Sequence, residues 1–409
     1  MKKRISKIIS LCTVMALLLS GCVTTDNSAG KEDSAPAAET DSAATEDTVE
    51  ETKEETGTVV QKVVDDYKDL SVKSDGKITV AHMLDSLSNE SSQRAYLQMQ
   101  NECEMRGWNL IGETDVAASY EADATRKAFE RVMAQEPDAI VISYLDIPPI
   151  ADLIQQARDR GIGIYSHGTD LSAGMLLNIE SAQGVIGAKI ASYAIQRNAG
   201  IFNTVGFIDF WAPRGVRRDI VAATLFEDGG WDVKETVHHN LTAEGYTDEL
   251  FSVVTNWLTK YGGDLDFVWT CWDTGSITAA QAMAAKGYTK DDMFTVGIDG
   301  GAMAWAYIRS GEIPFVASIA DCFEYQIHTT CEAIQQVHVE GKVPGEEGCI
   351  IPANNYITTD SMMVIIDESN VPDIGTNIHE VFGYYGGTSD DPEAWYNQGT
   401  AYTVQDYRE

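Results

Sequence analysis

The sequence has few basic residues. Among its 409 residues, 29 are Lys or Arg and 63 are Asp or Glu, which gives a formal net charge of -34 at pH 7. We find no basic patch in it. Since such a chain is repelled by phosphate backbones and by anionic lipid headgroups, its charge argues against nucleic acid and against an anionic membrane surface as partners.

Motifs for metal or catalytic chemistry are also missing. The sequence holds no C-x-x-C pair, no H-E-x-x-H, no P-loop and no G-x-S-x-G, so zinc binding and the common hydrolytic mechanisms lack support. His238 and His239 are adjacent, but no third ligand has a suitable spacing. We therefore expect no metal, no cofactor and no enzyme activity.

The cysteines beyond residue 75 are odd in number, so they cannot all pair internally. They are Cys103, Cys271, Cys322, Cys331 and Cys349. Buried free thiols are the favoured interpretation, and one disulfide stays open as the alternative.

The amino terminus has the pattern of an export signal. Basic residues precede an apolar run from Ile8 to Leu19, which is too short for a typical membrane-spanning helix. The tetrapeptide Leu19-Ser20-Gly21-Cys22 resembles the lipobox of bacterial lipoproteins. In that family the peptide is cut before the cysteine, whose thiol receives a diacylglycerol. The resemblance implies export and lipidation of Cys22 at the outer face of the cell membrane. An ordinary secretory signal that happens to contain a cysteine is the alternative.

The next segment, residues 23–75, is rich in Ser, Thr, Ala, Asp and Glu. It cannot bury enough apolar surface to offset its ordering entropy, and its like charges repel one another. We predict a disordered acidic linker that holds a globular body off the membrane. No second hydrophobic span follows.

The body of the chain alternates between short apolar runs and helical patterns. The first half predicts strands at 78–83, 108–113, 139–143 and 162–166, with helices at 91–106, 121–135 and 150–160 between them. A second series starts near residue 184 and ends with a strand at 315–320 and a long helix at 322–340. This alternation is typical of βαβ units and a parallel sheet.

The predicted fold class is therefore α/β, with two doubly wound parallel-sheet lobes joined by crossing hinge strands. We assign residues 76–180 and 321–357 to the first lobe, and residues 181–320 and 358–368 to the second. Residues 369–409 form a C-terminal extension without a clear period.

Two aspartates mark the carboxyl ends of strands in the second lobe. Asp273 follows the apolar run that starts at Phe267, and Asp299 ends the run Phe294 to Asp299. In an open α/β sheet, ligands bind beyond the carboxyl ends of the strands. The two carboxylates are therefore expected to form one wall of a ligand cleft.

Short motifs along the body carry a family resemblance. They are Asn89 in the first βα loop, Gly107-Trp108-Asn109-Leu110, Asp138-Ala139-Ile140-Val141-Ile142, Gly161-Ile162-Gly163-Ile164, Asp273, and Val296-Gly297-Ile298-Asp299-Gly300. In this order and spacing, from about Lys77 to Val364, the chain resembles the type I periplasmic sugar-binding proteins of the ribose- and galactose-binding class. The resemblance implies a two-lobed solute receptor of an ABC importer.

Departures from the family pattern affect the expected ligand contacts. The first loop continues Glu90-Ser91-Ser92 where the family has aromatic residues that stack on the sugar, and Trp272 replaces the Asn before Asp273. We therefore expect that the stacking surface has moved from the first lobe to the second.

The candidate ligand-binding residues combine carboxylates that accept hydroxyl hydrogen bonds, guanidinium or amide donors, and aromatic rings. They are Asn89, His167, Asp170, Trp211, Arg214, Arg217, Trp272, Asp273, Asp299 and Asp321. Structural alternatives stay open for them: a helix cap for Asn89 or Asp273, a turn for Asp299, lobe core for Trp272 or Trp211, and a surface helix start for either arginine.

We expect a substrate-binding lipoprotein of an ABC transporter. It captures a sugar or sugar-like polyol between its lobes and delivers it to the permease subunits, acting as a monomer. The alternative is a ligand-sensing receptor that feeds a histidine kinase or a chemoreceptor. A glycoside hydrolase is a third interpretation, because paired carboxylates also hydrolyse glycosides, but Asp273 and Asp299 serve a passive hydroxyl receptor equally well.

Overall fold

The computed structural model describes residues 70–116, 122–198, 203–210, 213–239, 245–399 and 402–405. The chain divides after residue 53 into two units, and the fold below belongs to the unit from Glu54 to Glu409. The predicted signal peptide with Cys22, most of the linker, and Trp211 lie outside the described residues.

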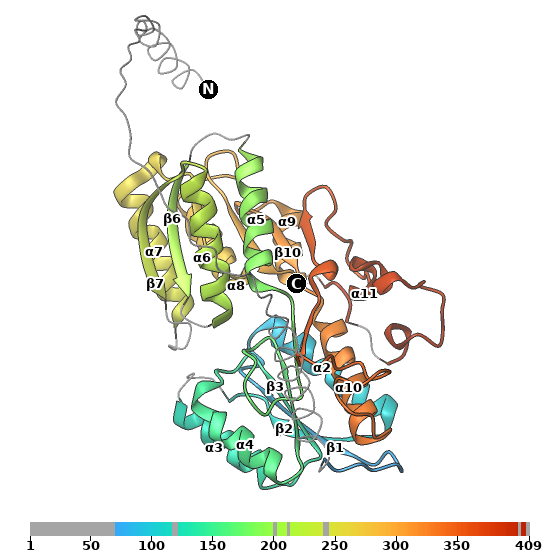
Figure 1. The fold of residues 1–409 in the computed structure, drawn as a ribbon. Helices are drawn as coiled ribbons and strands as arrows, with labels where there is room; N and C mark the ends of the chain where they lie inside the picture. The colour runs from blue at the N-terminus through green and yellow to red at the C-terminus, as the bar shows by residue number, and fades with distance from the viewer. Residues whose placement is uncertain are drawn as a thin grey trace, which may run out of the picture. The chain divides into compact units, whose positions relative to one another are not determined.

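The first lobe is built on a sheet whose described strands are all parallel, in the order β11-β5-β4-β3-β1-β2 (Figure 1). The strands are β1 (Thr79–Leu84), β2 (Asn109–Glu113), β3 (Ala139–Ser143), β4 (Gly163–His167), β5 (Leu177–Glu180) and β11 (Tyr356–Thr358). The order reverses between β1 and β3, which makes this edge the switch point of the sheet.

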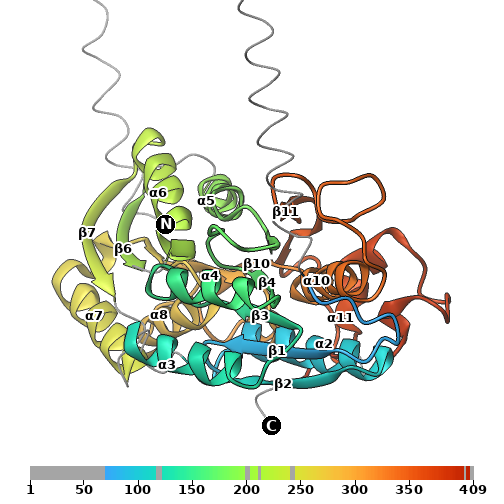
Figure 2. The ribbon, with the colours of Figure 1, turned by 60° about the horizontal axis from the view of Figure 1, so that its bottom comes forward.

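Helices cover both faces of this sheet (Figure 2). One face carries α2 (Glu90–Arg106) and α10 (Phe323–His338), and the other carries α3 (Ala122–Met133) and α4 (Ala151–Asp159). Alternate residues of each strand serve the two cores: Val141 packs toward α2 and α10, whereas Ile140 and Ile142 pack toward α3 and α4. Because both of its faces are buried, the central strand β3 is a continuous apolar run in the sequence.

The second lobe repeats this architecture. Its strands are β6 (Thr204–Phe210), β7 (Asp232–His239), β8 (Phe267–Trp269), β9 (Thr295–Asp299), β10 (Phe315–Ala320) and β12 (Val364–Asp367). They form two ladders, β7-β6-β8 and β9-β10-β12, that a parallel bridge between Phe267 and Phe294 connects. β12 is antiparallel to β10, and the strand order reverses between β6 and β8.

The helices of this lobe are α5 (Gln183–Arg197), α6 (Pro213–Asp228), α7 (Tyr246–Tyr261), α8 (Asp273–Ala285) and α9 (Ala302–Ser310). α5 packs on α6, and α7 packs on α8 (Figure 1). Within the core, the Phe226 and Trp231 rings stack at 5.0 Å, and Phe267 meets both rings edge-on. Aromatic pairs of this geometry add stability beyond their buried area.

Within the described residues the chain passes between the lobes at three places: after β5, after β10 and after β11. One residue from each passage joins a shared hydrogen-bond network. The side-chain amide of Gln326 donates to Ser181 Oγ at 3.1 Å, to Asp321 Oδ1 at 3.0 Å and to Thr359 Oγ1 at 2.8 Å. The network therefore connects the three crossing segments at the hinge.

The α/β architecture predicted from the sequence is confirmed, and its strands and helices are present with bounds that differ by a few residues. The sequence did not predict β5, β11 or β12, which have four residues or fewer. Such short strands have little pattern of their own, and pairing with a neighbouring strand decides them. In the extension, the structure has α11 (Ile378–Val381) and short 3-10 turns at Gly383–Gly386 and Trp395–Asn397.

The cysteines that the structure describes are all free thiols; Cys349 is half-buried and the others are buried. The helices of the described residues include none that is both long and apolar enough to cross a membrane. In the same part of the chain, no group of three or more His, Cys, Asp or Glu side chains could hold a metal ion.

Candidate ligand-binding site

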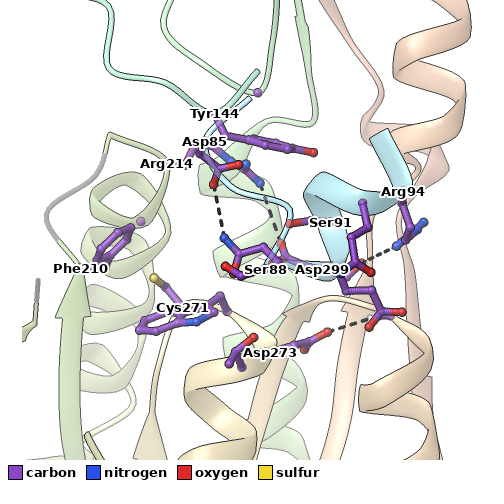
Figure 3. Close-up of a pocket in the computed structure, with 18 of the residues that line it drawn as sticks. Asp85, Ser88, Ser91, Arg94, Tyr144, Phe210, Arg214, Cys271, Asp273 and Asp299 are labelled. Carbon is purple, nitrogen blue, oxygen red and sulfur yellow. Dashed lines mark hydrogen bonds and ion pairs between the residues drawn. The ribbon is translucent and has the colours of Figure 1, made fainter. Parts of the chain in front are cut away.

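A cavity of about 240 Å³ lies between the two lobes. Its lining residues follow β1, β3 and β4 in the first lobe, and β6, β8 and β9 in the second. The switch points of both sheets therefore face the same cavity, which is the place where doubly wound folds bind ligands. Figure 3 shows Phe210 and Cys271 on one side of this cavity and Arg94 on the other.

Asp85 directly follows β1 and contributes a buried carboxylate to the cavity wall, 5% exposed. It accepts hydrogen bonds from Ser92 Oγ at 2.6 Å and from Asn89 Nδ2 at 3.3 Å. Burial raises the pKa of Asp85 to about 6, although these hydrogen bonds and Arg214 oppose the shift. Asn89 occupies the N-cap position of α2, but its side chain makes no capping bond and turns to Asp85 instead.

Tyr144 and Arg214 meet across the two lobes. Tyr144 follows β3 with a φ of 61°, which is unusual for a residue with a side chain. The Arg214 guanidinium, from the first turn of α6, lies 4.4 Å from the centre of the Tyr144 ring. Its Nη2 is 3.9 Å from Asp299 Oδ1, and its buried Nε has no hydrogen-bond partner among the described residues. The Arg214 side chain is 18% exposed and lines the cavity, so the outer nitrogens of its guanidinium can donate to a ligand.

Asp299 ends β9 and also has a left-handed backbone, with a φ of 114°. Its carboxylate accepts a hydrogen bond from Arg218 Nη2 at 3.2 Å. The Asp299 carbonyl accepts from Asp321 N at 3.1 Å and from Arg94 Nη1 at 3.3 Å. Non-glycine residues in such conformations are strained and concentrate at functional sites, where surrounding bonds hold them in place.

Asp273 lines the cavity, but most of its hydrogen-bonding capacity is used within the second lobe. Its Oδ2 accepts from Gly300 N at 2.7 Å and Gly301 N at 3.4 Å, and its Oδ1 accepts from Ser318 Oγ at 2.6 Å. Asp273 therefore holds the turn between β9 and α9 rather than capping its own helix. Burial first, and then the Asp299 charge, raise its pKa well above the usual range.

The apolar part of the cavity belongs to the second lobe. Phe210 and Trp272 lie with their ring centres 5.5 Å apart, and Cys271 lies beside them in the cavity wall. Trp272 is 8% exposed and is also part of the lobe core. Trp272 therefore lines the cavity and also packs in the core of the second lobe.

A buried ion pair supports the polar side of the cavity. Arg94 on α2 donates from Nε and Nη2 to the Glu324 carboxylate on α10, at 2.7 and 2.8 Å. Its remaining donors reach the carbonyls of Asp299, Gly300 and Asp321. One first-lobe side chain thus contacts the turn that carries Asp299 in the second lobe.

Two of the predicted residues lie behind the cavity wall. His167 shares a 2.7 Å hydrogen bond with Gln326 Oε1, and burial lowers its pKa well below the usual range. Asp321 accepts from Ser181 Oγ at 2.6 Å in the hinge network. Neither side chain lines the cavity.

Asp170 and Arg217, also predicted as ligand contacts, bind each other. Arg217 Nη1 donates to Asp170 Oδ1 at 2.5 Å, and its Nη2 is 3.5 Å from Glu180 Oε2. This ion pair joins the two lobes beside the cavity, and both side chains are more than one-third exposed. The structure therefore brings Asn89, Arg214, Trp272, Asp273 and Asp299 together at the cavity.

Several lining residues were not predicted from the sequence. They include Asp85, Glu90, Arg94, Tyr144, Phe210 and Arg218. For Asp85 and Tyr144 a usable signal existed, because each follows the end of a strand at the switch point of the first sheet. No local signal exists for Arg94, whose partner Glu324 is 230 residues away.

Comparison with known proteins identifies the family to which this fold belongs. The model of the periplasmic binding protein domain matches residues 80–326, more than half of the chain. The chain belongs to the periplasmic binding protein family. The resemblance predicted from its sequence motifs is therefore confirmed. No curated protein sequence matches the chain.

Solved structures of other periplasmic binding proteins share the fold at low identity. A galactofuranose-binding protein is 15% identical with a TM-score of 0.62, covering 75% of this chain and 97% of its own. A 5-methylthioribose transporter solute-binding protein from Thermotoga lettingae is 17% identical with a TM-score of 0.65, covering 80% and 98%. A solute-binding protein from Actinobacillus succinogenes with bound D-allose is 18% identical with a TM-score of 0.60, covering 72% and 98%.

Proposed function

We propose that this periplasmic binding protein is the substrate-binding lipoprotein of an ABC importer and captures one sugar or polyol between its lobes. The lobes comprise residues 76–180 with 321–357, and residues 181–320 with 358–368. The chain is exported, and a lipid on Cys22 tethers it to the outer face of the cell membrane. It binds its ligand without chemical turnover, as a monomer.

The observation that carries this proposal is the set of polar groups that face the cavity with capacity to spare. Arg214 offers donors from the second lobe, and the Asp85 and Asp299 carboxylates offer acceptors from both lobes. A ligand with several neighbouring hydroxyls both donates and accepts, so it satisfies this mixture without carrying a charge. An anionic ligand would meet the two carboxylates, and a cationic ligand would meet Arg214.

The aromatic wall complements this polar set. Phe210 and Trp272 both line the cavity, and their rings lie 5.5 Å apart. The C–H face of a sugar ring is the apolar surface that such rings cover. The solved relatives support the same ligand class, since their names or bound molecules include galactofuranose, 5-methylthioribose and D-allose.

Delivery to the permease follows from closure. With the lobes closed, Arg214 reaches Tyr144 and Arg217 reaches Asp170, so ligand contacts and rim contacts form together. The membrane subunits would then recognise the closed, loaded form, and hinge motion at the three crossing segments would release the ligand.

A thermal-shift screen tests the proposal. The panel consists of D-allose, allitol, myo-inositol, 5-methylthioribose, L-arabinose and galactofuranosides, each incubated with the protein and then analysed for products. A ligand at 100 times its dissociation constant stabilises by about 2.7 kcal/mol. We expect at least one panel member to raise the melting temperature without being converted.

A matched pair of variants locates the effect. Arg214→Met removes the free donors of the cavity, whereas Arg126→Met removes a guanidinium that pairs with Asp152 on the surface of the first lobe. The shift is expected to disappear in the first variant and to persist in the second. Unchanged shifts in both variants, or hydrolysis of a panel glycoside, would contradict the proposal.

A further inference from the structure

The described part of the C-terminal extension, residues 369–399 and 402–405, is anchored in the second lobe. Ile378, Phe382 and Val404 are buried in the core cluster that contains Trp305 of α9. The two ends of the extension are also bonded to each other: Ile378 N donates to Tyr402 O at 2.9 Å, and Val404 N donates to Thr376 O at 2.9 Å. The backbone of Tyr402 is therefore fixed to the second lobe.

The same extension packs on the first lobe. The Trp395 ring stacks on His328 of α10 with centres 4.2 Å apart and an angle of 7° between the planes. Tyr385 stacks on Tyr325 of the same helix at 5.1 Å. Figure 2 shows α11 next to α10. The extension is thus a strap that contacts both lobes.

Near its C-terminal end, the strap contacts a carboxylate that also bonds to the second lobe. Glu90, the first residue of α2, accepts hydrogen bonds from Ala302 N at 2.6 Å and Met303 N at 3.3 Å, the first two residues of α9 in the second lobe. Tyr402 Oη also donates to Glu90, at the oxygen Oε1 that accepts from Ala302 N. A carboxylate at a helix N-terminus satisfies free N–H groups and interacts favourably with the helix dipole. All of these donors come from the second lobe, and their acceptor comes from the first.

Opening the cleft must separate Glu90 from these donors. Glu90 lines the cavity, yet its carboxylate is engaged by α9 and by Tyr402, and Tyr402 itself does not line the cavity. The bonds therefore favour the closed arrangement whether or not a ligand is bound. The apparent affinity of a binding protein scales with the fraction of molecules in the competent state.

We propose that Tyr402 is a positioning residue of the ligand site: it holds Glu90 against the N-terminus of α9 and so raises the population of the closed cleft. The C-terminal strap thereby sets ligand affinity without touching the ligand. This inference rests on the proposed function for its effect on binding, but its effect on closure stands without a ligand.

The first test measures closure in the ligand-free, full-length chain. Spin labels at Lys127→Cys on α3 and Asn256→Cys on α7, in a background that carries Cys12→Ser, Cys22→Ser and Cys349→Ser, report the distance between the lobes by pulsed electron paramagnetic resonance. We expect Tyr402→Phe, which removes only the hydroxyl, to add a population with a longer distance. Tyr384→Phe is the matched control, because it removes another hydroxyl of the strap and should leave the distribution unchanged.

The second test uses the panel member that stabilises the parent protein most. Losing a hydrogen bond to a charged group predicts a dissociation constant about tenfold higher for Tyr402→Phe. The increase should lie in the dissociation rate, and the ranking of the panel should not change. Altered ranking would assign Tyr402 to ligand contact and overturn the positioning role.

Glu90→Gln provides an independent variant that keeps the shape of the acceptor and removes its charge. It is expected to shift the distance distribution in the same direction as Tyr402→Phe. Distributions identical to the parent in both variants would overturn the proposal, even if the panel identifies a ligand. Conversely, distance distributions that shift to longer values in both variants, with no ligand found in the panel, would support the role of the strap in closure and contradict only the proposed function.

Discussion

Replacing Asp299 by Asn isolates the contribution of one negative charge to ligand binding. Asn has nearly the same shape as Asp and is among the few residues that tolerate a positive φ, such as the 114° observed at this position. The substitution therefore keeps the turn between β9 and α9 and changes only the charge that faces Arg214, Arg218 and the cavity.

The expected magnitude follows from the contacts of Asp299. A hydrogen bond to a charged group contributes about 1.5–3 kcal/mol, against about 0.5–1.5 kcal/mol for a neutral one, so binding should weaken roughly 5- to 10-fold. The cost to the free protein is smaller, because Arg218 keeps its 2.7 Å bonds to Gln183 Oε1 and to the Cys271 carbonyl. We expect about 1 kcal/mol, which lowers the melting temperature by a few degrees.

Isothermal titration with the best panel ligand measures the affinity, and differential scanning calorimetry of the free protein measures the stability. An affinity within twofold of the parent would refute the role of Asp299 as a charged hydroxyl acceptor. A loss of more than about 4 kcal/mol of stability would instead identify a core ion pair as its main role.

Further substitutions test other parts of the site. Burial raises the pKa of Asp85 to about 6, so the part of the affinity that depends on its carboxylate should be complete above pH 7 and fall up to about tenfold by pH 5. Titrations across pH should show a smaller fall in Asp85→Asn than in the parent, since burial keeps His82 and His167 neutral over that range while the raised pKa values of Asp146 and Asp273, which also line the cavity, are common to both proteins. Trp272→Leu should weaken binding of ring-shaped ligands roughly 2- to 10-fold by fluorescence titration, and equal losses for the open-chain allitol would exclude stacking. Arg94→Met should lower the free energy of unfolding, measured with denaturant, by about 3–5 kcal/mol because it leaves the buried carboxylate that pairs with Arg94 without its partner. A variant as stable as the parent would show that this carboxylate becomes protonated.

The central strands of both lobes were predictable because they are buried on two faces. Val141 serves one core and Ile140 the other, so β3 appears in the sequence as an unbroken apolar run. β5 and β11 were not predictable in this way, because they are short and gain their definition from pairing with each other at the hinge. The sequence thus predicts the layers well and the crossing segments poorly.

The candidate site divides along similar lines. Asp273 and Asp299 follow strands of the second lobe, and the strand-end rule that selected them would also have selected Asp85 and Tyr144 in the first. His167 follows the same rule, but the Tyr144 ring lies 4.9 Å from it and His167 bonds to Gln326 instead of lining the cavity. Strand ends therefore locate the cavity, and side-chain packing decides which residues reach it.

Contacts over long sequence separations were beyond prediction. The local sequence around Glu90 indicates only the first, acidic turn of a helix. The groups that donate hydrogen bonds to its carboxylate lie 212 and 312 residues away. Arg217 and Asp170 were both predicted as ligand contacts from the family pattern and from their charge, and the structure pairs them with each other. Charge type alone does not distinguish a ligand contact from an ion pair between lobes.

The central claim is that a polyhydroxylated ligand binds between the lobes and contacts both of them. A crystal structure of the protein with its best panel ligand tests this claim most directly. We predict ligand hydroxyls within hydrogen-bond distance of Asp85 in the first lobe and of Arg214 and Asp299 in the second, with the ring against Trp272. A ligand bound outside this cavity, or held by one lobe alone, would contradict the account.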